Sequence, residues 1–253
     1  MEHANKQALL TELVNLSHRL GEEWREYLII GEGNTSARID EHTFYVKASG
    51  ANLRTIQPDQ IVEIDWNRVR VLLDGQPTDE DVTRVLSESR VDPTASARPS
   101  VETVLHGALY DLTDAKFIGH AHPVYPNAVL CSERARDITR HLMPDEIVVC
   151  GIESVFVPYT DPGVPLAREV IARVREVIDR QGEMPRTLYL QNHGVFALGQ
   201  TPRQVENIMA MAVKHAKILM GTYGLGGPNF LTDRDIARIH HRPDEAVRQA
   251  QFK

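Results

Sequence analysis

The chain has 253 residues, of which 42% are hydrophobic and 25% are charged, and its formal net charge is −7. These values suit a folded protein with a sizeable core, and the acidic balance argues against a general nucleic-acid binder, which normally carries a basic stripe. The amino-terminal residues lack the apolar stretch of a secretory signal, and no apolar run is long enough to span a bilayer. We therefore expect a cytoplasmic protein in which Cys131 and Cys150 are free, buried thiols.

The first hundred residues are expected to form a helix followed by short strands. Leucines recur at helical spacing near the amino terminus, and short β-branched or aromatic runs bounded by turn residues follow. The predicted elements are a helix over 5–28, a turn and strand over 29–39, and further strands over 43–48, 61–64 and 69–73. The polar segment 77–97 is expected to be helical or irregular.

The remainder of the chain alternates between helical and strand patterns. Ser100 is a favourable N-cap, and Pro202 suits the first turn of a helix. The predicted elements are helices over 100–110, 126–132, 165–181 and 201–223, and strands over 115–122, 147–150, 188–191 and 195–198. The polar tail, residues 224–253, is expected to be mobile or to dock on a neighbouring subunit. Together these elements predict a single α/β domain over residues 1–253, with its core over about 8–223.

Two histidines at alternate positions of one predicted strand are the most informative feature of the sequence. His120 and His122 flank Ala121, and side chains at i and i+2 of a strand point to the same face. A catalytic zinc ion takes three protein ligands and leaves one position open. A lone His-x-His pair is more often unrelated to a metal, so the metal reading needs a third ligand.

His193 and Glu102 are the candidates that complete such a site. His193 lies in a glycine-containing turn between two predicted strands, and Glu102 lies near the start of a predicted helix. The simpler alternatives are a buried histidine bonded to backbone and a carboxylate that complements a helix dipole. Three histidines and one carboxylate without cysteine favour a catalytic site for Zn²⁺, although Mn²⁺ and Co²⁺ accept the same ligands. The carboxylate could then serve as an acid or base.

Three segments could hold an anion. The first, residues 31–36, supplies small residues and free backbone amides. The second, Lys47 through Ser49 to Gly50, supplies a cation, a hydroxyl and a flexible amide, and the third is Ser100, at a predicted helix start. None matches a Walker loop or a Rossmann fingerprint. Ordinary tight turns remain the alternative for each glycine cluster.

The ordered set of these motifs resembles the class II aldolase/adducin family over residues 8–223. Its members are Gly33-Asn34-Thr35-Ser36, Lys47-Ala48-Ser49-Gly50, Pro99-Ser100-Val101-Glu102, His120-Ala121-His122 and Asn192-His193-Gly194. Segments 98–103 and 157–163 are most similar to the aldolase module of rhamnulose-phosphate aldolase/dehydrogenase-type proteins, which is itself fuculose-phosphate aldolase-like. The resemblance implies an αβα fold around a central mixed, mainly antiparallel sheet, and a homotetramer with sites at subunit interfaces.

The resemblance also implies a role for each motif residue. Zinc would be held by His120, His122 and His193, with Glu102 as a further ligand and as the acid/base. The substrate phosphate would be held by Asn34, Ser49, Gly50 and Ser100, with Lys47 adding charge. The implied reaction is retro-aldol cleavage of a ketose 1-phosphate through a metal-stabilised enediolate. The partner is then a small sugar phosphate or sugar acid, with no role for nucleic acid or membrane.

Departures from the family pattern keep other reactions open. Segment 144–149 lacks the tyrosine that fuculose-phosphate aldolases use as a second acid/base, and Val101 replaces a phosphate-binding serine. Tyr159, or Tyr223 from a neighbouring subunit, is a possible substitute. A decarboxylase of a 3-oxo sugar acid phosphate needs no such tyrosine and is the main alternative. A pentulose-phosphate 4-epimerase, which carries Asp at position 102, and a non-enzymatic adducin-like domain, which lacks the metal ligands, are less favoured.

One further residue shares a helical face with Glu102. His106 follows it by four residues, which places the two side chains one turn apart. We expect His106 to pack in the core or to support the site, and not to bind the metal itself.

Overall fold

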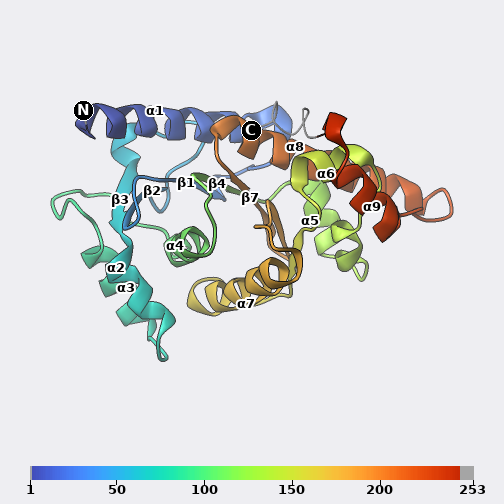
Figure 1. Ribbon diagram of the computed structural model, residues 1–253. Coiled ribbons are helices and arrows are strands. Elements are labelled where there is room, and N and C mark those ends of the chain that lie inside the picture. The colour runs from blue at the N-terminus through green and yellow to red at the C-terminus, as the bar shows by residue number, and fades with distance from the viewer. Residues whose placement is uncertain (1, 246–253) are drawn as a thin grey trace.

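The computed structural model describes residues 2–245, and its centre is one seven-stranded sheet (Figure 1). The strand order is β3-β2-β1-β4-β7-β6-β5, and every neighbouring pair is antiparallel except β5 and β6. The strands are β1 (Asn34–Arg38), β2 (Thr43–Lys47), β3 (Ile61–Asp65), β4 (Phe117–Ala121), β5 (Val155–Val157), β6 (Thr187–Leu190) and β7 (Gly194–Gly199). The predicted mixed, mainly antiparallel sheet flanked by helices is therefore confirmed.

Helices cover both faces of the sheet. α1 and α8 pack together on one face, and α4 and α7 pack together on the other, as Figure 1 shows along its upper and lower sides. The helices are α1 (Glu2–Leu20), α2 (Trp66–Val69), α3 (Asp79–Glu88), α4 (Thr103–Leu112), α5 (Val124–Leu130), α6 (Pro144–Cys150), α7 (Val164–Gln181), α8 (Pro202–Tyr223) and α9 (Asp233–His240). In the described part of the chain, no helix combines the length and apolar character needed to cross a membrane.

Side chains of β1 alternate between these two helical layers. The Thr35 hydroxyl lies 2.6 Å from that of Ser17 in α1, whereas the Ser36 hydroxyl lies 2.7 Å from the Tyr110 hydroxyl in α4. This alternation follows from the two-residue repeat of a strand. In β4 the same repeat points Gly119 toward α1 and α8, where an added Cβ would meet Leu20 and Val205, and points His120 toward the α4 layer.

Two predicted strands are helical in the structure. Residues 69–73 belong to α2 and the following 3₁₀ turn (Arg70–Leu73), which buries Val69 and Leu72 three residues apart. Residues 147–150 belong to α6, which starts at Pro144 and has acidic residues in its first turn. Their β-branched composition suggested strands, but burial of α6 against α8 and α9 outweighs this weak preference. The short strand β5 was not predicted.

Several predicted boundaries also shift. The first helix ends at Leu20 and not at residue 28. The next residue, Gly21, passes so close to Arg54 that an added Cβ would lie 2.5 Å from the Arg54 nitrogen, so the chain requires glycine where the helix ends. α4 starts at Thr103 and not at Ser100, and the Ser100 hydroxyl accepts a hydrogen bond from the Glu102 amide. Segment 77–97 contains α3, capped by Thr78.

The tail and one cysteine also differ from expectation. Residues 233–240 form α9, which is capped by Thr232 and packs against α6 of the same chain. The rest of the predicted tail beyond residue 245 lies outside the described residues. Cys150 is buried as expected, whereas Cys131 is exposed, and both are free thiols.

Candidate metal centre

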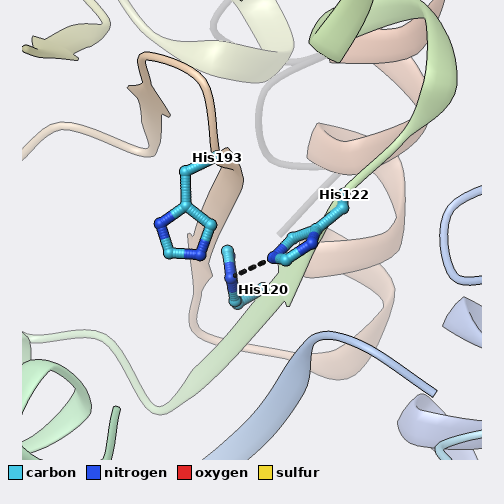
Figure 2. Close-up of side chains that lie close together, drawn as sticks. All are labelled: His120, His122 and His193. Atoms are coloured by element: carbon cyan, nitrogen blue, oxygen red, sulfur yellow. Dashed lines mark hydrogen bonds between the residues drawn. The ribbon is translucent and has the colours of Figure 1, made fainter. Parts of the chain in front are cut away.

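Three imidazoles converge at one end of the central strands (Figure 2). His120 lies in β4, paired with Phe196 of β7 and Asn34 of β1, and His122 follows directly after β4. His193 lies in the turn that joins β6 to β7, and its backbone carbonyl accepts a hydrogen bond from the Asn127 side chain. One ligand nitrogen from each histidine lies within 4.8 Å of the other two. Among the described residues, this is the group of His, Cys, Asp and Glu side chains that could hold a metal ion.

The hydrogen bond of His120 to the backbone leaves its Nε2 atom available as a metal ligand. Its Nδ1 lies 3.1 Å from the Val195 carbonyl oxygen, which only accepts, so Nδ1 carries the proton and Nε2 carries a lone pair. The Nε2 atoms of His120 and His122 are 2.9 Å apart. Burial lowers the pKa of both imidazoles, and that of His120 falls well below its ordinary value. Neutral imidazoles are the form that binds a divalent metal.

Glu102 supplies a carboxylate next to this cluster. Its Oε1 lies 3.2 Å from His193 Nε2 and 3.6 Å from His120 Nε2, while its Oε2 accepts a hydrogen bond from the Asn34 amide. Burial would raise the pKa of this carboxyl, but its interaction with His120 and its hydrogen bonds with His193 and the Asn34 amide outweigh burial and hold the pKa well below its usual range. An ionised carboxylate with one oxygen facing three imidazoles suits a fourth metal ligand or a base. The residues present thus fit a divalent metal.

The predicted anion-binding residues lie at the end of β2 and at the segment before α4. The Ser49 amide donates to the Arg98 carbonyl at 2.7 Å, and Ala48 bridges to Pro99, so the two segments run side by side. This pairing brings Ser49 and Gly50 toward Ser100. Gly50 adopts a φ of 76°, in the left-handed region that glycine favours.

Lys47 is buried in the same region. Burial lowers the pKa of its amine, and the charge of Glu102 acts against that shift, so the two groups lie within electrostatic range. No hydrogen bond or ion pair to its amine is found within residues 2–245. A buried ammonium near the carboxylate is suited to an anionic substrate group.

Three further residues lie behind Asn34: His106, which was expected to pack in the core or to support the site, Ser36 of the segment expected to hold an anion, and Tyr110, for which no role was predicted. Asn34 contacts Glu102, and behind it lie His106, Ser36 and Tyr110, joined by side-chain hydrogen bonds. The sequence spacing could have indicated this group. Glu102, His106 and Tyr110 are four residues apart, which places them on one face of a helix, and Asn34 and Ser36 are two residues apart, which places them on one face of a strand.

The two tyrosines considered as a second acid/base form hydrogen bonds, through their hydroxyl groups, with carboxylates of the same chain. The Tyr159 hydroxyl donates to Asp161 at 3.1 Å, and the Tyr223 hydroxyl donates to Asp137 at 2.5 Å. The Tyr159 amide donates to the Gln191 side chain, two residues before His193, so this segment adjoins the histidine turn. A catalytic role for either tyrosine stays a prediction.

Gly194 allows β7 to approach the histidine pair, and replacing it with alanine should disrupt the cluster. An added Cβ would lie 2.4 Å from the Ala121 carbonyl oxygen and 2.7 Å from His122 Cδ2. Because neither strand can shift freely, His122 should be displaced, and metal affinity should fall by about 10–100-fold, as it does when outer-shell support is lost. Competitive metal titration measures this. Gly221→Ala in α8, where a Cβ would meet nothing within 4 Å, is the control and should leave affinity unchanged.

Comparisons with known proteins define the class. The family model for the class II aldolase and adducin N-terminal domain matches residues 11–220. The chain therefore belongs to the class II aldolase and adducin family. Among solved structures, an L-fuculose 1-phosphate aldolase superposes with a TM-score of 0.70 at 21% identity, covering 92% of this chain and 94% of its own. YgbL from Escherichia coli gives a TM-score of 0.68 at 20% identity, covering 92% and 98% of the two chains. These two likenesses concern the fold.

Curated relatives in this family are enzymes. A 3-oxo-tetronate 4-phosphate decarboxylase from Haemophilus influenzae is 23% identical over 86% of this chain and 90% of its own length. A methylthioribulose-1-phosphate dehydratase from Microcystis aeruginosa is 29% identical over 76% of this chain and 85% of its own length. Both names specify small sugar-phosphate substrates, and the two reactions differ.

Proposed function

We propose that this protein is a divalent-metal-dependent lyase that acts on a small sugar phosphate. In this proposal His120, His122 and His193 hold the metal, and Glu102 is a further ligand and the acid/base. The observation that carries it is the convergence of three imidazole nitrogens within 4.8 Å, with the Glu102 carboxylate 3.2 Å from one of them. Three histidines without a thiolate favour Zn²⁺, and Mn²⁺ or Co²⁺ would accept the same set.

The chain's own residues supply binding and proton transfer. A divalent metal at this site would supply Lewis-acid stabilisation of the negative charge that develops on the substrate. Lys47, Ser49, Gly50 and Ser100 would hold the phosphate, and the remaining N–H of the Asn34 amide could also donate to it. Glu102 would give or take the proton at the substrate carbon whose bond breaks, because its free oxygen faces the same space as the imidazoles.

Retro-aldol cleavage of a ketose 1-phosphate is the first candidate reaction. Decarboxylation of a 3-oxo sugar acid phosphate is the second, and one specific observation favours it. Segment 144–149 has no tyrosine, and its Glu146 is buried against His141 and His215. Expulsion of carbon dioxide needs no base to take the proton of a hydroxyl that becomes an aldehyde oxygen, and the Haemophilus relative is named for such a reaction.

We also propose a cytoplasmic homotetramer with the site near a subunit interface. Trp24, Ile29 and Ile30 are 74%, 69% and 90% exposed in the single chain. They flank Tyr27 in the sequence, and the Tyr27 carbonyl accepts a hydrogen bond from the His122 amide, so these exposed apolar residues lie close in the chain to a contact of a metal ligand. Covering these side chains with a second copy would account for their exposure in the single chain.

Metal analysis followed by product analysis tests the proposal. Untagged protein purified without added metal should contain about one divalent ion per chain. The loaded protein should then be screened with ketose 1-phosphates and 3-oxo acid phosphates. Release of an aldehyde identifies an aldolase, release of carbon dioxide identifies a decarboxylase, and loss of water identifies a dehydratase. Protein that contains no metal and takes none up on titration would contradict the proposal and favour an adducin-like binding domain.

A further inference from the structure

A buried chain of hydrogen bonds leads from Glu102 to the far end of α4. Glu102 Oε2 contacts the Asn34 amide, and Asn34 Oδ1 contacts His106 Nε2. On the other side of the ring, His106 Nδ1 lies 2.7 Å from the Ser36 hydroxyl, which lies 2.7 Å from the Tyr110 hydroxyl. This series of hydrogen bonds joins Asn34 and Ser36 of β1 to Glu102, which directly precedes α4, and to His106 and Tyr110 within α4.

The ionised Glu102 carboxylate at one end of this series of hydrogen bonds fixes which atom donates at every step. An ionised carboxylate only accepts, so Asn34 must turn its NH₂ toward Glu102 and its oxygen toward His106. His106 must therefore carry its proton on Nε2, and its Nδ1 accepts from the Ser36 hydroxyl. Ser36 in turn accepts from the Tyr110 hydroxyl. All donors therefore point toward Glu102, and a flipped Asn34 amide would place its oxygen against the Glu102 carboxylate, which also only accepts.

Burial makes this order costly to change. His106 and Ser36 have no exposed surface, and Asn34 and Tyr110 are also buried. A buried donor or acceptor that loses its partner is destabilising, because no water replaces the lost hydrogen bond. Burial also lowers the pKa of His106 to about 4, so the ring stays neutral near pH 7 with a single proton.

The repeats of the two elements bring the residues into register. Four residues of a helix rise about 6 Å, and two residues of a strand rise about 6.6 Å. Glu102, His106 and Tyr110 therefore advance along α4 at nearly the pace at which Asn34, Ser36 and Arg38 advance along β1. Arg38 ends the series, since its guanidinium donates to the Tyr110 carbonyl.

We propose that His106 is a positioning residue for Glu102, acting through Asn34. Its Nε2–H holds the Asn34 amide in the orientation that ties down Glu102 Oε2, which leaves Oε1 directed at His120 and His193. The position of the Glu102 carboxylate follows from these hydrogen bonds and does not depend on which reaction the protein catalyses. Its consequence for turnover rests on the function proposed above, in which Glu102 is the acid/base.

Crystal structures of metal-loaded variants test the proposal without an activity assay. In His106→Phe, Asn34 should rotate and the Glu102 carboxylate should leave its place beside His193. In Tyr110→Phe, which removes only the distal hydroxyl, both should stay. An unmoved Asn34 and Glu102 in His106→Phe would overturn the proposal. If His106→Phe does not fold, ¹⁵N NMR of the metal-free wild-type protein decides the matter. A His106 proton on Nε2 supports the positioning role, and a proton on Nδ1 overturns it.

Kinetics then connect position to function. His106→Phe should lower kcat by about 10–100-fold with KM and metal content nearly unchanged, a size typical of lost second-shell support. His106→Gln should recover most of kcat, because its amide offers a donor to Asn34 and an acceptor to Ser36. A displaced carboxylate in His106→Phe with unchanged kcat would overturn the catalytic part of the proposal. A wild-type protein that takes up metal but turns over no sugar phosphate would instead contradict the proposed function, while the structural test of His106 stands.

Discussion

At saturating metal, where the three histidines still hold the ion, Glu102→Gln is expected to lose about 10²–10⁴-fold in kcat, the contribution typical of a positioned acid or base. The two side chains have the same shape, and the glutamine oxygen can still accept a hydrogen bond from Asn34. The amide that replaces Oε1 cannot take a proton from the substrate. The measurement is kcat with the substrate found by the product screen, together with metal content for the same sample.

Glu32→Gln is the matched control for this substitution. Glu32 also places a negative charge near the cluster, since it acts electrostatically on His122, but its carboxylate accepts hydrogen bonds from the Ile29 and Ile30 amides. It should therefore change kcat far less than Glu102→Gln does. Equal losses in the two variants would mean that only the local charge matters, and unimpaired turnover in Glu102→Gln would show that the acid/base role is wrong.

His193→Ala is expected to abolish metal binding, with stoichiometry falling from about one ion per chain to nearly none. Loss of an outer-shell partner already costs about 10–100-fold in affinity, and loss of a ligand should cost more. His193 is the best of the three to remove, because it lies in a turn with its side chain partly exposed, whereas His120 is fully buried and stacked on Phe196. Metal content and turnover should fall together.

Thermal unfolding supplies a second readout for His193→Ala. Metal that binds only the folded protein stabilises it by about 2.7 kcal/mol at a hundredfold excess over Kd, so the wild-type Tm should rise with metal and that of the variant should not. His18→Ala is the control: this histidine is also partly buried, but it bonds to the Ile56 carbonyl, and its loss should leave the metal response intact. A metal-dependent Tm in His193→Ala equal to that of the wild type would exclude His193 as a ligand.

Local pattern was sufficient for the parts of the fold where spacing within one element decides the outcome. The amphipathic repeats of α7 and α8 predicted both helices nearly to their ends. The His-x-His pair predicted two imidazoles on one side of a strand, because a strand repeats every two residues. The sequence was misleading where β-branched runs lie in helices, as in residues 147–150, since their burial against α8 and α9 involves residues distant in the chain.

The sequence by itself determined which residue types stand at which spacing, and hence the candidate ligands, the anion-binding segments and the family. Only the tertiary structure decided that α4 lies along β1, so that Glu102 reaches the histidines and His106 reaches Asn34. Spacing within a helix or strand follows from local backbone geometry, which the sequence encodes directly. Which helix packs on which strand depends on how all the buried faces fit together, and that is settled only by the folded chain.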